Sequence, residues 1–225
     1  MGFEIPLPRA GEIWQAVVGY LSDKTWLQAR QNLLSGWDLM KSRNPKGMYE
    51  VLEYEATLEL KDNKGRKALV SKREKVRYLQ DNVIAFQDQA WGDGKILQNY
   101  RCSPGVAIDM YRSGYKTLIL ISRREVKMRG EIDEFRIDWG IRQGFLKPTG
   151  FWAAEINHTT GNIKMRVIFP RTRPPVKAVV LEKNRQRTTS LGESNFLNLP
   201  GGKREIVWEN SKPQLFEQYI LSWEW

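Results

Sequence analysis

The residue types that most often support catalysis are scarce in this sequence of 225 residues, which contains one histidine and one cysteine. The histidine is His158, and any Ser-His-Asp triad or histidine-based metal site would have to use it alone. Its segment, residues 157–162, is typical of a turn between two strands. The cysteine, Cys102, precedes a Pro-Gly turn, and nothing places it near His158. An inert thiol and a turn histidine are therefore the favoured interpretation, and we expect no catalytic residues.

Metal and phosphate sites are also not indicated. Asp88, Asp93 and the acidic residues at 131–134 offer oxygen ligands, but their spacing is not that of a calcium loop. No GxxxxGK[ST] motif is present, and the glycines at 201–202 lie between strand-like runs. We expect no metal and no cofactor.

Basic side chains give the best functional signal, because 36 Lys and Arg against 26 Asp and Glu leave a net charge of +10. The surplus is concentrated in two segments, residues 64–77 and 164–187. On alternating strands, many of these side chains would project together into solvent. The candidate nucleic-acid or anion-binding residues are Arg73, Lys75, Arg77, Lys164, Arg166, Arg171, Arg173, Arg185 and Arg187. We call them the basic set.

Two interpretations of the basic set stay open. If its members converge, they would bind the phosphates of DNA or RNA with a strong dependence on salt. Alternatively, Lys and Arg on wet strand faces keep the protein soluble and prevent pairing between sheet edges. We favour the second interpretation, because no RNP, KH, helix-turn-helix or zinc-finger pattern is present.

Residues 1–46 are predicted to form a helical segment. Apolar residues recur at three- and four-residue spacing over 13–21, and Ser22 offers an N-cap for a second helix. This helical hairpin would either cover an open end of the following domain or dock a protein partner. The candidate partner-binding residues are Trp14, Val17, Val18, Trp26 and Leu27.

From residue 47 onward the hydrophobic period changes to two, which predicts strands. In residues 49–60 the even positions from Leu52 to Leu60 are apolar, while glutamates occupy most odd positions. We expect about ten strands, in an antiparallel β-sandwich or partly closed barrel. The expected strands span 49–60, 68–78, 83–91, 96–100, 118–128, 133–142, 150–156, 163–169, 176–181, 205–208 and 215–225.

Several features indicate a cytoplasmic protein. One cysteine allows no intrachain disulfide, and the N-terminus lacks the basic start and continuous apolar stretch of a signal peptide. Apolar runs are also too short to span a bilayer as a helix, so no membrane insertion is expected.

The sequence thus predicts a mainly β protein with two parts, a helical segment at 1–46 and a β-rich domain at 47–225. Without a catalytic set, we expect a non-catalytic recognition or regulatory module that binds a protein partner. Nucleic-acid binding through the basic set is the alternative. A third hypothesis is a β-barrel that holds a small apolar ligand. The aromatic residues that could line such a cavity, although packed core is favoured for them, are Trp139, Phe151, Trp152, Trp208, Trp223 and Trp225.

Overall fold

Residues 47–225, the part of the chain that the computed structural model describes, form three β-sheets. The elements are β1 (Tyr49–Leu60), β2 (Lys67–Tyr78), β3 (Val83–Ala90), β4 (Lys95–Ser103), β5 (Val106–Ser113), β6 (Lys116–Lys127), β7 (Ile132–Arg142), β8 (Thr149–Glu155), β9 (Thr160–Phe169), β10 (Lys177–Glu182), β11 (Arg187–Ser190), η1 (Glu193–Asn195), β12 (Phe196–Asn198), η2 (Pro200–Gly202), β13 (Arg204–Asn210) and β14 (Gln218–Glu224). The helical hairpin expected over 1–46, with Trp14, Val17, Val18, Trp26 and Leu27, lies outside these residues.

A seven-stranded sheet runs across the whole molecule in the order β12-β13-β9-β1-β2-β7-β4. Two smaller sheets, β11-β10-β14-β8 and β3-β6-β5, complete the fold. All pairings among the described strands are antiparallel except that of β1 with β9, which is parallel. Every one of these sheets keeps two free edges. The described residues therefore form an open sandwich and not a partly closed barrel.

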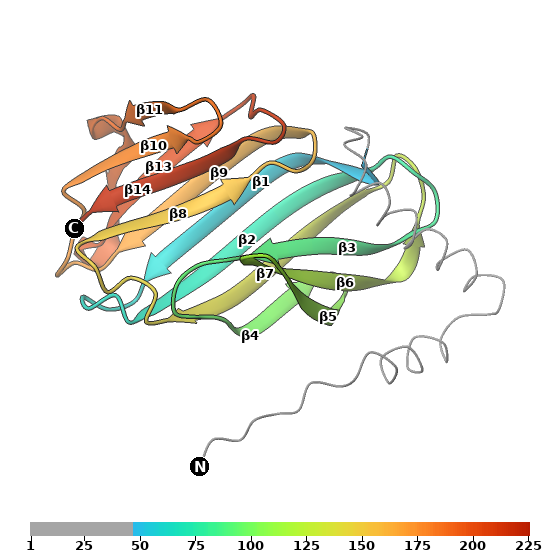
Figure 1. Ribbon diagram of the computed structural model, residues 1–225, viewed down its shortest axis with the longest axis horizontal. Helices are drawn as coiled ribbons and strands as arrows, with labels where there is room; N and C mark the ends of the chain where they lie inside the picture. The colour runs from blue at the N-terminus through green and yellow to red at the C-terminus, as the bar shows by residue number, and fades with distance from the viewer. Residues whose placement is uncertain (1–46) are drawn as a thin grey trace, which may run out of the picture.

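The two smaller sheets cover neighbouring halves of one face of the large sheet (Figure 1). On one half, Trp223 of β14 packs against Phe169 of β9, with ring centroids 5.6 Å apart. On the other half, Phe86 of β3 stacks on Phe135 of β7 at 4.1 Å. Because both contacts join buried rings across the layers, the core is the space between the large sheet and its two covers.

Strand β1 departs from the expected alternation at its start. Tyr49 and Val51 are buried, and the pairing with β2 shifts register between Val51 and Glu53. This β-bulge leaves Leu52 without a partner in the ladder, so the inward positions change from odd to even along the strand. The apolar face expected from Leu52 to Leu60 is therefore interrupted at its start, where Leu52 is only half-buried.

Short or exposed edge strands were missed by the sequence patterns. β5 lies at the edge of its sheet, and most of its side chains are exposed or half-buried, so the hydrophobic alternation is weak. β11 and β12 are also edge strands, with four and three residues. The mainly β prediction is confirmed. Within residues 47–225, no helix is long and apolar enough to cross a membrane.

Candidate functional site

A pocket of about 440 Å³ lies where the two covering sheets meet above the large sheet. Its floor comes from the large sheet, with Leu58 of β1, Val70 of β2 and Trp139 of β7. The turn after β3, which includes Trp91 and Asp93, forms one side. The opposite side is formed by β8, β10 and β14. We call this site the seam pocket. Its size is typical of a small-molecule site.

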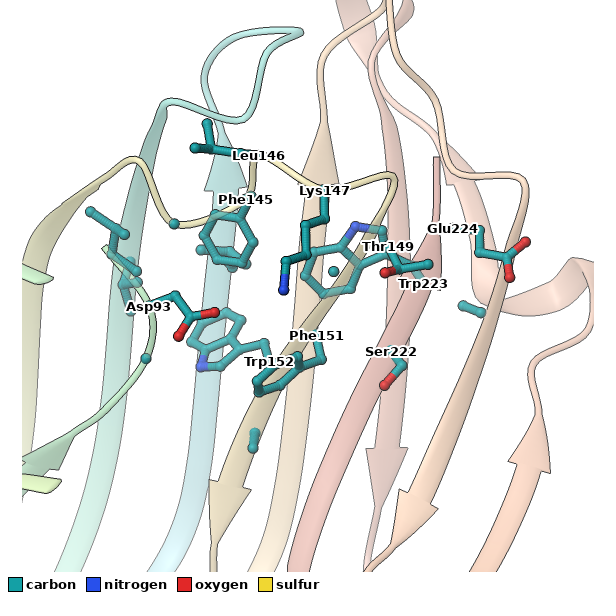
Figure 2. A pocket seen from close by; sticks show the side chains of 18 of the residues that line it. Asp93, Phe145, Leu146, Lys147, Thr149, Phe151, Trp152, Ser222, Trp223 and Glu224 are labelled. Atoms are coloured by element: carbon teal, nitrogen blue, oxygen red, sulfur yellow. The ribbon is translucent and has the colours of Figure 1, made fainter. Parts of the chain in front are cut away.

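Aromatic rings dominate the wall of the seam pocket. Figure 2 shows Phe145, Phe151, Trp152 and Trp223 arranged around it. Trp152 and Trp223 belong to the inward-facing rows of β8 and β14, whereas Phe151 belongs to the outward-facing row and is 52% exposed. The pocket therefore extends past the free edge of β8 to the outer face of that sheet.

The segment 143–148 between β7 and β8 forms the upper rim and is fastened at both ends. The backbone N–H of Phe145 donates to the carbonyl of Gly65 at 3.1 Å, which ties the rim to the β1–β2 turn. The carbonyl of Lys147 accepts from Trp225 Nε1 at 2.9 Å and from the guanidinium of Arg173 at 3.2 Å. Arg173 also stacks over the Trp225 ring at 3.6 Å. These contacts hold the rim in one position.

One buried donor in the pocket wall has no acceptor. Within residues 47–225, the indole Nε1 of Trp223 makes no hydrogen bond, although the side chain is only 2% exposed. Gly150 of β8 faces this ring so closely that a Cβ atom there would lie 2.5 Å from it. The absence of a side chain at Gly150 therefore gives Trp223 its place in the wall. A buried donor without an acceptor is costly in a protein interior.

Charged side chains surround the mouth. Lys177 and Glu224 form an ion pair at 2.9 Å on the outer side. Lys147, on the rim, extends its ammonium toward the pocket, and Asp93 lies on the other side (Figure 2). Among residues 47–225, no ion pair involves Lys147 or Asp93. Both charges are thus available to a bound molecule.

Neither a family model nor a curated protein matches the chain. Among solved structures, an M1 zinc metallopeptidase from Deinococcus radiodurans is similar, with a TM-score of 0.46 and 10% identity. A mutant of the same enzyme gives the same values. The match covers 77% of this chain and 42% of the peptidase chain, so this chain corresponds to less than half of it. At this level of similarity nothing about function is transferred to this chain.

Beside the pocket, between the large sheet and the three-stranded sheet, lies a buried charged cluster that the sequence analysis did not identify. Lys72 of β2 forms ion pairs with Glu74, at 2.8 Å, and with Asp88 of β3. Tyr100 donates to Asp88 at 2.9 Å. The Lys72 ammonium also lies 5.8 Å from the ring centroid of Trp139, which lines the pocket. We call Lys72, Glu74 and Asp88 the buried triad.

The protonation states of the buried triad follow from its surroundings. Burial alone would lower the pKa of Lys72, but Asp88 and Glu74 raise it well above its usual value. Burial raises the pKa of Glu74. Lys72 therefore stays protonated and is not a nucleophile at neutral pH. Because Lys72 and Asp88 come from different sheets, their ion pair joins the three-stranded sheet to the large one.

Neither His158 nor Cys102 belongs to the seam pocket. Burial raises the pKa of the Cys102 thiol, which reduces its thiolate fraction. His158 packs against the ring of Tyr49, with centroids 4.3 Å apart, in the turn between β8 and β9. Burial lowers its pKa from 6.5 to about 4. Among residues 47–225, no group of three metal-ligating side chains comes together.

Part of the basic set is brought onto one surface. Arg73, Lys75 and Arg77 of β2, together with Lys164 and Arg166 of β9, lie on the outer face of the large sheet. β1 runs between the two strands, and its Glu55 is paired with both Arg73 and Lys164 in the register. A row of carboxylates therefore separates the two basic rows.

These arginines and lysines are engaged in ion pairs. Arg73 contacts three carboxylates, those of Glu53, Glu55 and Glu134, at 2.6, 3.2 and 3.1 Å. The other pairs on this face are Lys75–Glu53, Arg77–Glu50, Lys164–Glu209 and Arg166–Glu205. Elsewhere, Arg185 and Arg187 pair with Glu182. Arg171 and Arg173 follow β9, outside this face. The arrangement supports a charge-balanced surface more than a phosphate groove.

We expect the double variant Glu53→Gln/Glu55→Gln to bind duplex DNA at low salt more tightly than the unaltered protein. The change removes carboxylates that neutralise Arg73 and Lys75, so each freed cation can bind a phosphate. Because the pairs are partly exposed, unfolding free energy should change by less than about 1 kcal/mol. Fluorescence anisotropy across a salt series measures the affinity.

The matched control for that variant is Glu125→Gln/Glu193→Gln, which makes the same change in net charge away from this face. It should bind DNA no better than the unaltered protein does. Tight, steeply salt-dependent binding by the unaltered protein would contradict our interpretation and make the basic set a nucleic-acid site.

Proposed function

We propose that this protein binds a small, largely apolar ligand in the seam pocket. The observation that carries the proposal is the aromatic part of the lining, which consists of four tryptophans and two phenylalanines: Trp91, Trp139, Trp152, Trp223, Phe145 and Phe151. Apolar cavities with a small number of polar groups at fixed positions are the usual form of small-molecule sites. The hypothesis from the sequence placed such a ligand inside a β-barrel, and the proposal places it between the layers of a β-sandwich.

The seam pocket is suited to a flat or ring-containing molecule. Its floor and walls present planar side chains, which favour stacked or edge-on contacts with a planar ligand. The rim at 143–148 is held by hydrogen bonds from Trp225 and Arg173, so little ordering would be needed on binding. A preorganised site loses less conformational entropy on binding than a flexible one.

The protein-partner hypothesis remains a prediction. Its candidate residues, Trp14, Val17, Val18, Trp26 and Leu27, lie outside the described part of the chain, and the comparisons with known proteins give it no support. We rank it below ligand binding for this reason.

The variant Trp152→Ala is expected to weaken binding of the neutral fluorescent probe N-phenylnaphthylamine by about tenfold, because it removes a large aromatic contact from the wall. A fluorescence titration gives the Kd. The matched control is Trp208→Ala, which removes an equally large ring that packs on Tyr219 and does not line the pocket.

Trp208→Ala should leave the affinity for the probe unchanged, and thermal unfolding should verify that both variants are folded. An organic extract of the purified protein, analysed by mass spectrometry, would reveal a copurified ligand directly. Absence of saturable probe binding, or equal affinity in both variants, would refute the proposal.

A further inference from the structure

We propose that the ligand of the seam pocket carries one anionic group, such as a carboxylate, that binds the ammonium of Lys147. This inference rests on the proposed function and specifies the chemical class of the ligand: an amphipathic anion with an apolar, ring-containing body. Three features of the mouth and the wall support it.

The first feature is the position of Lys147 on the rim. Figure 2 shows its side chain extending from the rim into the space between the rings of Phe145 and Trp223, with Asp93 on the far side of the pocket. No carboxylate within residues 47–225 lies at ion-pair distance from this ammonium. By contrast, the neighbouring Lys177 is already paired with Glu224. Lys147 is thus the lining cation that a ligand can use.

The second feature is the excess of positive charge around the mouth. Arg173 lies against the rim, where it donates to the carbonyl of Lys147 at 3.2 Å, and it forms no ion pair with another residue of 47–225. On the other side, Asp93 precedes Lys95, which is the cross-strand partner of Arg142 in the β4–β7 pairing. Within residues 47–225, the nearby carboxylates that form no ion pair are those of Asp93 and of Asp62, which interacts electrostatically with Arg173, so the cations still outnumber them. A positive field at the entrance raises the local concentration of anions.

The third feature is the donor in the wall. The indole N–H of Trp223 is buried beside Gly150 and has no acceptor in the described part of the chain. Lys147 and Trp223 are both donors, and a carboxylate supplies several lone pairs for such groups. Asp93, being an acceptor on the opposite side, would repel the head group and orient it toward the rim.

Two fluorescent probes with the same ring systems test the inference. Anilinonaphthalene sulfonate is an anion, and N-phenylnaphthylamine lacks the sulfonate. We expect the anionic probe to bind about fivefold to tenfold more tightly than the neutral probe. This difference corresponds to about one charge-assisted contact that is partly exposed to solvent. Its affinity should fall as salt is raised, while that of the neutral probe should not. Mutual displacement establishes that both probes occupy one site.

The variant Lys147→Gln should remove this preference, so that the two probes bind with similar affinity. Folding should be preserved, because Lys147 contributes its backbone carbonyl to the rim contacts and its side chain is exposed. Lys183→Gln is the matched control, since Lys183 does not line the pocket, and it should bind both probes as the unaltered protein does. Asp93→Asn should strengthen binding of the anion.

The outcomes separate this inference from the proposed function. If both probes bind the unaltered protein equally and Lys147→Gln changes neither affinity, the anionic class is wrong while the pocket function stands. If Lys183→Gln lowers the affinity for the anionic probe as much as Lys147→Gln does, the probe binds surface cations and the inference fails. If neither probe binds, both proposals fail together.

Discussion

Replacing Lys72 by methionine is expected to lower the free energy of unfolding by about 3–5 kcal/mol. The reason is that Lys72 is 7% exposed and Asp88 is 2% exposed, so the substitution leaves a carboxylate buried without its cation. The loss also removes one of the contacts that join the three-stranded sheet to the large one. Urea unfolding, followed by tryptophan fluorescence, measures the change.

Two further variants identify the cause. Lys75→Met removes a half-exposed lysine from the same strand, and it should change stability by less than about 1 kcal/mol. The triple variant Lys72→Met/Glu74→Gln/Asp88→Asn removes all three charges and keeps an acceptor for Tyr100, so it should recover much of the loss. If the single and triple variants are equally destabilised, lost packing and not uncompensated charge is the cause.

Stability is expected to fall by about 3 kcal/mol between pH 6.5 and pH 4 through His158 alone. Burial lowers the pKa of His158 from 6.5 to about 4, so the unfolded chain binds a proton first as the pH falls. The contribution is complete above the unfolded pKa, and it is lost as the pH approaches the folded pKa. Chemical unfolding at several pH values measures the trend.

The variant His158→Phe is the control for this pH dependence, because it keeps a ring against Tyr49 and cannot titrate. The difference in unfolding free energy between the two proteins gives the effect of the histidine alone, because the carboxylates that titrate in the same pH range are present in both. Since the chain has one histidine, a single imidazole signal in an NMR titration reports its pKa directly. A folded-state pKa near 6.5, or parallel stability curves for both proteins, would show that the ring is solvated.

Strand positions were largely predictable because period-two patterns depend on local sequence alone. The strand expected at 49–60 has those bounds, and the one expected at 133–142 differs from β7 by a single residue. The pairing of strands was harder to predict from the sequence, because the parallel contact between β1 and β9 joins segments far apart along the chain. No local pattern specifies such a contact.

The candidate site was predictable only in part. Of the six aromatic residues considered for a cavity, Trp139, Phe151, Trp152 and Trp223 line the seam pocket, whereas Trp208 and Trp225 do not. Lys147 was missed, because a lysine in a turn has no distinguishing pattern. The signal for the buried triad was present in β2, where Lys72 and Glu74 occupy the inward positions between Val70 and Val76. Two charges on an apolar face indicate a buried polar contact.

The parallel pairing of β1 with β9 has a consequence for synthesis on the ribosome. Val51 lies opposite Thr160, so the edge of β1 that faces β9 stays unpaired until most of the chain has been made. An open edge of this length can pair with another chain, and nascent molecules are most exposed to that risk during this interval. The glutamates along β1 form ion pairs in the folded protein. On two incomplete chains, their like charges would oppose association.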